Sequence, residues 1–203
     1  MKNIILIFFI FCFSFKNTEA KNLISDFVPF NLDGSINVIV EIPAGTNEKW
    51  EILKDGTKIE REIKDGKFRI VDYLSYPFNY GFIPQTILPI SKGGDGDPLD
   101  VIVISSSVKR GSIIKAKPIG ALIMIDNKEI DTKILALGIN SGELSQMNSI
   151  RQLNENYNGL LDIIILWLKN YKGEVLELKS QLTKSETIDY IKKSNIFFSD
   201  NIN

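Results

Sequence analysis

The sequence predicts a mainly β fold of the α+β class, in which short strands form a small closed or nearly closed barrel and helices follow late in the chain. Three observations predict it. Short runs rich in β-branched and aromatic residues fill residues 37–139. Glycine and aspartate turns separate these runs, and helical periodicity begins only at Tyr157. Many short strands joined by tight turns are typical of a barrel.

The predicted strands follow one another closely. The first two are Asn37–Ile42 and Trp50–Leu53, and turn signals at residues 54–56 and 64–66 (both Lys-Asp-Gly) punctuate the region after them. The later strands are expected at Lys67–Val71, Val101–Ser105, Ile113–Ile125 and Lys133–Ile139.

The last third of the chain predicts two helices. Apolar residues recur at helical spacing in Tyr157–Tyr171. Thr183 and Glu186 have the spacing of a capping box, which would open a last helix running towards Phe198. Because no repeat and no second domain boundary is visible, we expect one domain over residues 21–203.

The first twenty residues have the order of a secretory signal peptide. Lys2 precedes the apolar run Ile4–Phe15, and Thr18 and Ala20 fit the small-x-small cleavage pattern. The run is too short to span a bilayer, which needs about 20 apolar residues. We therefore expect residues 1–20 to be removed and the mature protein to be periplasmic or secreted; an uncleaved anchor is the alternative.

The composition excludes several kinds of catalytic site. The chain has no histidine, and its only cysteine, Cys12, lies in the segment expected to be cleaved. These facts exclude a His-ligated zinc site, a Ser-His-Asp triad and a cysteine nucleophile. The formal net charge is −1, with both signs interspersed, so no basic nucleic-acid surface is indicated. A catalyst of this composition would depend on Asp, Glu, Lys, Arg, Tyr and a hard metal ion.

The strongest local signal is an acidic loop rich in glycine. Asp95, Asp97 and Asp100 lie within six residues, and a predicted strand follows at once. One interpretation is a solvated acidic turn. Like charges this close favour protonation, however, and a divalent cation with oxygen ligands relieves that conflict. The pattern of a structural Ca²⁺ loop is interrupted by Pro98 and Leu99, so a catalytic metal loop is favoured.

A second acidic cluster lies between two predicted strands, at residues 126–133. By itself it indicates a hairpin turn. Asp126 and Asp131 could, however, converge with the first cluster at the rim of a barrel.

These two clusters and five other stretches resemble family I of the soluble inorganic pyrophosphatases. The family signature D-[small]-D-[PE]-apolar-D-apolar matches in full at Asp95–Val101. The other matches, in the order of the family, are Glu41-Ile42-Pro43, Lys49-Trp50-Glu51, Lys67-Phe68-Arg69, Tyr76-Pro77-Phe78-Asn79-Tyr80-Gly81, Asp126 with Asp131-Thr132-Lys133, and Tyr171-Lys172. The resemblance spans about residues 37–175.

The resemblance implies a five-stranded, OB-like closed barrel with two or three outer helices. It implies Mg²⁺-dependent hydrolysis of pyrophosphate to two phosphates by a metal-activated water, through direct in-line attack without a covalent intermediate. Several Mg²⁺ ions would bind at each site, and Mn²⁺ could substitute. The family default is a cytoplasmic homo-oligomer, a hexamer or else a dimer.

The resemblance also assigns roles to individual residues. Asp97 would be the general base, and Arg69, Tyr80 and Lys172 would join it as catalytic groups. The metal-binding carboxylates would be Asp95, Asp97, Asp100, Asp126 and Asp131. The substrate-binding residues would be Lys49, Arg69, Tyr80, Lys133, Tyr171 and Lys172. Glu41, Glu51 and Tyr76 would form an outer part of the site.

Two positions depart from the family pattern. Asn127 stands where many bacterial members have Glu, and Trp50 where Tyr is more usual.

Two other classes of protein share parts of the pattern. An OB-type nucleic-acid-binding module would need a basic face with stacking aromatic residues, which the net negative charge disfavours. An inactive Ca²⁺-stabilised domain is disfavoured because Asp97 and every phosphate-binding position are filled.

Overall fold

The computed structural model describes residues 21–171 and 176–202. The expected signal peptide, residues 1–20, lies outside the described residues, and so does Lys172.

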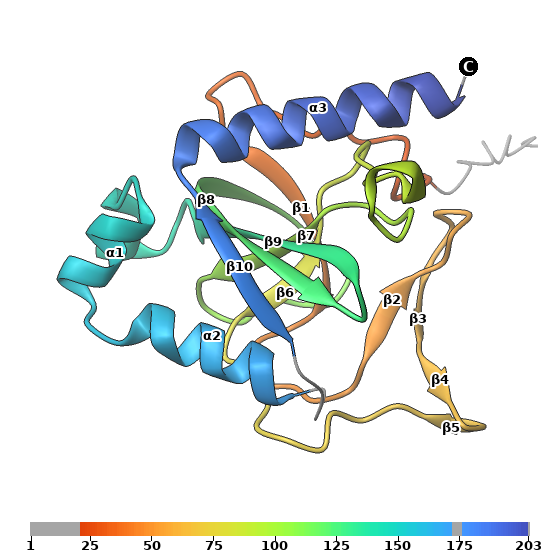
Figure 1. Cartoon of the computed structure of the whole chain (residues 1–203), viewed down its shortest axis with the longest axis horizontal. Coiled ribbons are helices and arrows are strands. Elements are labelled where there is room, and N and C mark those ends of the chain that lie inside the picture. The colour runs from red at the N-terminus through yellow and green to blue at the C-terminus, as the bar shows by residue number, and fades with distance from the viewer. Residues whose placement is uncertain (1–20, 172–175, 203) are drawn as a thin grey trace, which may run out of the picture.

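A closed ring of strands forms the centre of the molecule (Figure 1). Its members, in the order in which they pair, are β1 (Ile36–Ile42), β6 (Asn79–Phe82), β7 (Asp100–Ile104), β9 (Glu129–Gly138) and β8 (Ile113–Asp126). The pairing of β8 with β1 closes the ring, and β7 with β9 is its parallel pair. The expected five-stranded closed barrel is therefore confirmed within the described residues.

The long strand β8 makes this closure possible. One half of it pairs with β1, and the other half pairs with β10 (Glu177–Leu182), which lies outside the ring. The register of β8 against β9 shifts between Pro118 and Gly120, which is a bulge of the kind that bends a strand. A Cβ on Gly120 would lie 2.4 Å from the side chain of Ile150 and 2.7 Å from the carbonyl oxygen of Leu182. Glycine is required there because two other elements approach the bend closely.

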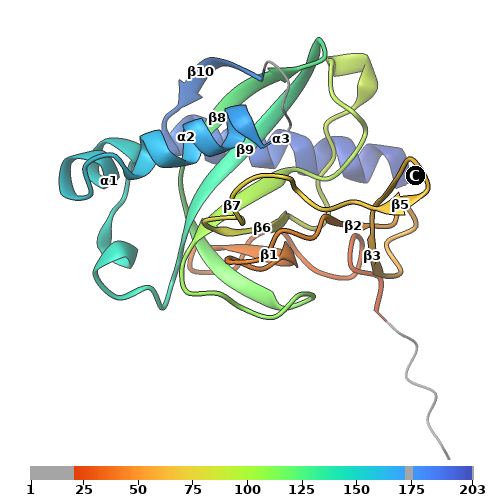
Figure 2. The same cartoon turned by 90° about the horizontal axis from the view of Figure 1, so that it is seen from below.

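Helices cover opposite sides of the barrel (Figures 1 and 2). Helices α1 (Ile150–Asn156) and α2 (Leu160–Asn170) lie on one side, where Trp167 and Leu168 of α2 join the larger cluster of buried apolar residues. Helix α3 (Lys184–Ile202) crosses the other side, where Ile191 joins a second cluster. Among the helices of the described chain, none is long and apolar enough to cross a membrane.

Two small hairpins stand beside one end of the barrel. Strands β2 (Trp50–Ile52) and β3 (Ile59–Arg61) form the first, and β4 (Ile63–Lys64) and β5 (Lys67–Phe68) form the second. Short 3₁₀ turns follow at η1 (Ile90–Lys92) and η2 (Gly142–Gln146). Figure 1 shows both hairpins projecting from the barrel on the side away from α1.

Several predicted boundaries differ from the observed ones. The strand expected at Lys67–Val71 is confined to β5, because after Arg69 the chain leaves the β4 side and bonds to the segment before β2, through an isolated bridge between Ile70 and Glu48. The helix expected from Tyr157 begins at Leu160, because Gly159 has a left-handed φ of 82°. The capping box is confirmed: Glu186 Oε2 accepts the Thr183 N–H at 2.8 Å, and Thr183 Oγ1 accepts the Glu186 N–H at 3.3 Å.

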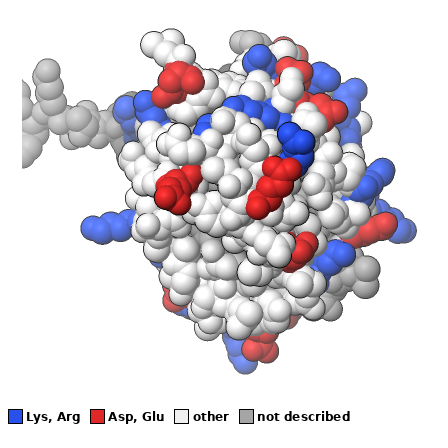
Figure 3. All heavy atoms as spheres, turned by 90° about the vertical axis from the view of Figure 1, so that its left-hand side faces the viewer, with Lys and Arg blue, Asp and Glu red and all other residues white. Residues whose placement is uncertain are grey.

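Charges of both signs are scattered over the face that carries α1. Figure 3 shows that face, where Lys and Arg lie among Asp and Glu and a broad central area carries neither. The interspersed signs agree with the near-neutral formal charge of the sequence. This face therefore lacks the continuous basic surface that a nucleic-acid-binding module would present.

Candidate active site

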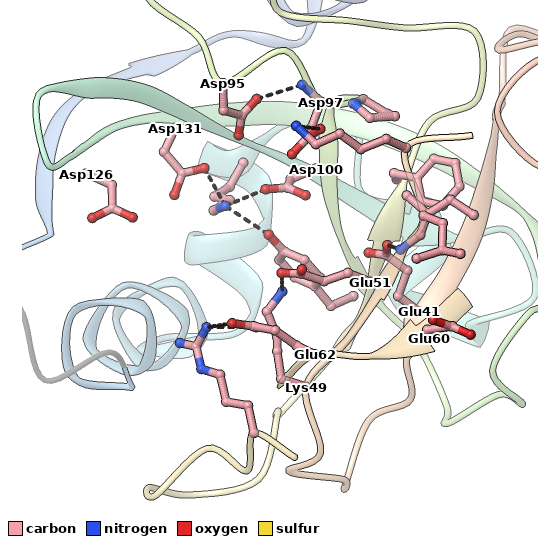
Figure 4. Close-up of a pocket in the computed structure, with 18 of the residues that line it drawn as sticks. Glu41, Lys49, Glu51, Glu60, Glu62, Asp95, Asp97, Asp100, Asp126 and Asp131 are labelled. Atoms are coloured by element: carbon pink, nitrogen blue, oxygen red, sulfur yellow. Dashed lines mark hydrogen bonds and ion pairs between the residues drawn. The ribbon is translucent and has the colours of Figure 1, made fainter. Parts of the chain in front are cut away.

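A cavity of about 540 Å³ opens at the end of the barrel beside the β2–β3 hairpin. Figure 4 shows its charged side chains pointing towards one another from separate elements. The lining contains ten acidic and five basic residues: Glu41, Glu51, Glu60, Glu62, Asp95, Asp97, Asp100, Asp126, Glu129 and Asp131, with Lys49, Lys54, Arg61, Arg69 and Lys133. Acidic groups therefore outnumber basic groups two to one in a confined space.

The topology explains how the two acidic clusters of the sequence meet. Strands β7 and β9 run parallel, with Asp100 directly opposite Lys133, so both strands begin at the same end of the barrel. The acidic loop leads into β7, and the turn between β8 and β9 leads into β9. All five predicted metal-binding carboxylates line this one cavity.

Lys133 lies at the centre of the carboxylates. Its side chain is only 3% exposed, and its ammonium donates to Asp100 Oδ2 at 2.6 Å and to the Tyr80 hydroxyl at 2.8 Å, and also pairs with Asp131. Burial alone would lower the pKa of Lys133, but the carboxylates of Asp100 and Asp131 more than offset it and raise that pKa. The buried lysine therefore remains charged, as a buried ion pair requires.

The acidic loop is folded around its own backbone. Asp95 Oδ1 accepts the Asp97 N–H at 2.9 Å, and Gly96 between them has a left-handed φ of 83°. The Asp97 side chain is half exposed, and Lys54 lies 3.7 Å from its Oδ1. Burial, and next the charge of Asp95, raise the pKa of Asp97 above its ordinary value. Asp97 therefore has more affinity for a proton than an isolated aspartate.

The outer wall of the cavity is formed by Glu41, Lys49 and Glu51. Glu41 is 5% exposed, and its Oε1 accepts the Ile52 N–H at 2.6 Å. The Lys49 ammonium lies 2.7 Å from Glu51 Oε1. Burial raises the pKa of Glu41 to about 8, although the nearby Lys49 ammonium opposes this effect.

Arg69 is held by a partner that the sequence did not indicate. Its Nη1 donates to both carboxylate oxygens of Glu62, at 2.9 and 2.8 Å. Glu62 lies in the run Glu60-Arg61-Glu62, and nothing in that run distinguishes it from a solvated surface segment. The turn at residues 64–66 places Glu62 opposite Arg69, and the fold directs both side chains into the same cavity. Lys54, Glu60, Arg61 and Glu129 also line the cavity without having been predicted.

Aromatic residues support one side of the cavity. Tyr80 and Tyr171 line it, and Tyr171 stacks on Trp167 with ring centroids 4.6 Å apart and an interplanar angle of 8°. Burial raises the pKa of Tyr80 well above its ordinary value, so its hydroxyl stays neutral. Tyr76 is 2% exposed and lies behind the lining, 5.8 Å from Tyr80 and 4.3 Å from Trp167 between ring centroids.

The oxygen-rich lining fits a hard divalent cation, although no cage is preformed. Within residues 21–171 and 176–202, no three carboxylates converge closely enough to hold a metal ion between them. The Lys133 ammonium lies between Asp100 and Asp131 instead. This arrangement suits Mg²⁺, which keeps several waters and is usually bound by one or two carboxylates together with substrate phosphates. It does not resemble a closed Ca²⁺ or zinc site.

Comparison with known proteins identifies similar chains. Residues 38–195 match the family model of inorganic pyrophosphatase. The inorganic pyrophosphatase of Drosophila melanogaster is 41% identical over 151 residues, which cover 67% of this chain and 44% of that protein. This chain spans about half the length of the curated relatives that it matches first.

Solved structures show the same fold. The type I inorganic pyrophosphatase from Toxoplasma gondii superposes with a TM-score of 0.82 at 28% identity, and the match covers 88% of each chain. A truncated vacuolar soluble pyrophosphatase from Trypanosoma cruzi, solved in complex with PPi, gives a TM-score of 0.80 at 26% identity and covers 87% of this chain and 77% of that one.

Proposed function

The chain belongs to the inorganic pyrophosphatase family, and from that premise we propose that it hydrolyses inorganic pyrophosphate to two phosphates in a Mg²⁺-dependent reaction. One observation carries the proposal. The five carboxylates and three of the cations that the family resemblance selects, Lys49, Arg69 and Lys133, line one cavity although they come from separate elements.

The charge balance of the cavity supports both a polyanionic substrate and a divalent metal. A pyrophosphate anion alone would be repelled by a lining in which acidic groups outnumber basic groups. Asp95, Asp97, Asp100, Asp126 and Asp131 would hold the Mg²⁺ ions. When bound, these ions would neutralise substrate charge and lower the pKa of water to near neutrality.

Asp97 is the general base of the proposed reaction. Its half-exposed carboxylate can reach a water in the cavity, and burial beside Asp95 raises its proton affinity. The water attacks one phosphorus in line with the departing phosphate, and Asp97 takes the proton that the water loses. No covalent intermediate is required, because the water attacks the phosphorus directly, and the absence of histidine from the chain costs this mechanism nothing.

The basic and phenolic groups stabilise the charge that gathers on the leaving phosphate. Arg69 has a planar guanidinium that can grip two phosphate oxygens, and Glu62 fixes its Nη1. Lys49 acts as a point charge, while Tyr80 and Tyr171 contribute neutral hydroxyl groups at the cavity wall. We propose that Lys172, which follows Tyr171 directly, joins this set. Catalysis then depends on positioning and electrostatic stabilisation.

Replacing Asp97 by asparagine tests the proposal. Purified protein with millimolar Mg²⁺ should release phosphate from pyrophosphate and release little from ATP. Asp97→Asn should lower kcat by about 10²- to 10⁴-fold, because asparagine cannot accept the proton. The matched control is Asp162→Asn, which makes the same change at an exposed position of α2.

Phosphate release, measured alongside circular dichroism, distinguishes the outcomes. The control should keep the wild-type rate, and both variants should keep the wild-type spectrum. A wild-type protein that releases no phosphate would refute the proposed activity. Near-normal turnover by Asp97→Asn would remove Asp97 from the role of base.

A further inference from the structure

The segment Gln85–Leu88, which we call the strap, lies directly beside the acidic loop. The Leu88 N–H donates to the carbonyl of Asp97 at 3.2 Å, and the Leu88 carbonyl accepts the Gly96 N–H at 3.0 Å. The Thr86 hydroxyl accepts the Leu99 N–H at 3.0 Å. The strap is thus hydrogen-bonded to the backbone of Asp97 and to the backbone of Gly96 and Leu99 on either side of it.

The other edge of the strap is bonded to helix α3. The Ser194 side chain is buried, with only 2% of the residue exposed. Its hydroxyl accepts the Ile87 N–H at 2.8 Å and donates to the Ile87 carbonyl at 2.7 Å. The neighbouring Asn195 donates from Nδ2 to the carbonyl of Gln85 at 2.7 Å. Figure 1 shows α3 running along the side of the barrel on which the segment between β6 and β7 lies.

The strap needs these external bonds because its first residue is strained. Gln85 has a φ of 52°, in the left-handed region that disfavours residues with a Cβ. Its N–H donates to the Ile24 carbonyl and its Nε2 to the Ser25 carbonyl, both at 2.7 Å. Residues far away in the sequence therefore hold Gln85 in this backbone conformation, and we expect it to relax if its hydrogen bonds to Ile24 and Ser25 were broken.

We propose that Ser194 is a positioning residue for Asp97, acting through the strap. This inference rests on the proposed function, in which Asp97 is the base. Ser194 does not line the cavity, so it contacts neither substrate nor metal. It fixes the peptide groups of Ile87, and the next residue, Leu88, fixes the backbone that presents the Asp97 carboxylate.

The expected signature is a loss of turnover with little loss of substrate affinity. Lys49 and Arg69 lie on the other side of the cavity, on or beside the hairpins, and the strap bonds neither of them. Ser194→Ala should lower kcat about tenfold and change KM less than about twofold, because a base displaced by a fraction of an ångström loses efficiency. A merely structural role for Ser194 would lower the melting temperature and leave kcat per folded molecule unchanged.

The experiment compares Ser194→Ala with Ser199→Ala in the full chain. Ser199 lies on the same helix but is exposed, and its hydroxyl donates to the Asn195 carbonyl one turn earlier. Amide hydrogen exchange of peptides covering residues 85–99 gives a readout independent of activity. Ser194→Ala should speed exchange in these peptides about tenfold, whereas Ser199→Ala should match the wild type. Ser194→Thr, which keeps the hydroxyl, should restore both kcat and protection.

Asn195→Ala is the second variant, in case Ser194→Ala does not fold. It frees the Gln85 carbonyl from the same helix and should also speed exchange and lower kcat. Wild-type kcat in folded Ser194→Ala, or in folded Asn195→Ala if Ser194→Ala does not fold, would overturn the inference whatever the exchange rate, and would leave the proposed function intact. An inactive wild-type protein would refute the proposed function, and the exchange data would still decide whether α3 holds the strap.

Discussion

Glu41 shows how burial can set the charge of a single side chain at the cavity wall. It points from β1 towards the β2–β3 hairpin, where it accepts the Ile52 N–H. Burial raises the pKa of its carboxyl to about 8, from an ordinary value of 4.5. The folded protein therefore binds a proton at Glu41 more tightly than the unfolded chain does.

The sign of the resulting pH effect follows from linkage. The contribution of Glu41 to the free energy of unfolding is fully present below pH 4.5 and is lost as the pH rises through about 8. The Glu41→Gln variant keeps the acceptor oxygen but cannot ionise, so its free energy of unfolding should not show this decrease as the pH rises. Urea denaturation of the wild type and of Glu41→Gln at several pH values between 5 and 9 measures the difference in the free energy of unfolding. Stability curves that stay parallel over this range would contradict the prediction.

At the residue scale, motif spacing predicted the carboxylates but could not predict their partners. The sequence singles out Asp95, Asp97 and Asp100 because like charges so close together repel one another and favour protonation. The pairing of Arg69 with Glu62 is local: the two residues lie opposite each other in the continuation of the β4–β5 hairpin, where the Arg69 N–H donates to the Glu62 carbonyl at 2.9 Å. Trp50, noted as a departure, stacks against the Arg110 guanidinium, which lies 3.6 Å from its ring centroid, and this contact joins residues far apart in the sequence.

At the element scale, the turn between β8 and β9 carries backbone strain close to the site. Asn127 and Lys128 have φ values of 47° and 75°, as the two central residues of a type I′ hairpin turn do. A Cβ crowds the backbone in this conformation; the short polar side chain of asparagine can offset the cost by hydrogen bonding locally, whereas the side chain of lysine cannot. Glycine is the residue that such turns prefer at the second position.

Lys128→Gly should therefore stabilise the protein by about 0.5 to 1 kcal/mol. Lys64→Gly makes the same chemical change at an exposed residue of β4, where glycine should instead cost about 0.5 to 1 kcal/mol. Urea midpoints of the two variants, at equal m values, measure the difference. A Lys128→Gly protein less stable than the wild type would show that the turn is not strained.

The elements that the sequence missed lack the pattern on which prediction depends. Strand β6 is short and contains Asn79 and Gly81, and a Cβ on Gly81 would lie 1.9 Å from the carbonyl oxygen of Ile39. Helix α1 has no apolar periodicity beyond Ile150 and Leu153, and it is started by the Ser149 side chain, which accepts the Gln152 N–H. Strand β10 is largely polar because it lies outside the ring. Tertiary contacts, rather than local preference, define the two strands, whereas α1 also depends on its local Ser149 cap.

At the scale of the whole molecule, the site borders the core, because Tyr80 belongs to the larger cluster of buried apolar residues and also lines the cavity. The buried apolar residues form two clusters that α2 and α3 cover, and the site carboxylates lie outside both. A closed barrel also leaves few unpaired edges, and protein elements alone bury both clusters, so we expect the fold to persist without a bound ligand. The sequence predicted a barrel from its strands, but the parallel pairing of β7 with β9, which brings the two acidic clusters together, follows only from the topology.

Removing divalent metal should therefore abolish activity without unfolding the protein. With excess EDTA, phosphate release should stop while the circular dichroism spectrum stays unchanged. Adding Mg²⁺ back should restore turnover and raise the melting temperature, because a ligand that binds only the folded state stabilises it. The control is NaCl at the same ionic strength, which should restore neither. Full turnover in EDTA would contradict metal dependence.

The strap also ties the site to the order in which the chain can fold. Its bonds join residues 60, 107 and 110 positions apart, from Ser25 to Gln85 and from Ile87 and Gln85 to α3. Contacts that span such distances form late, because long loops must close first. All five barrel strands precede α3 in the chain. The barrel can therefore form before the support of the base is in place, and we expect the docking of α3 to complete the fold and the site together.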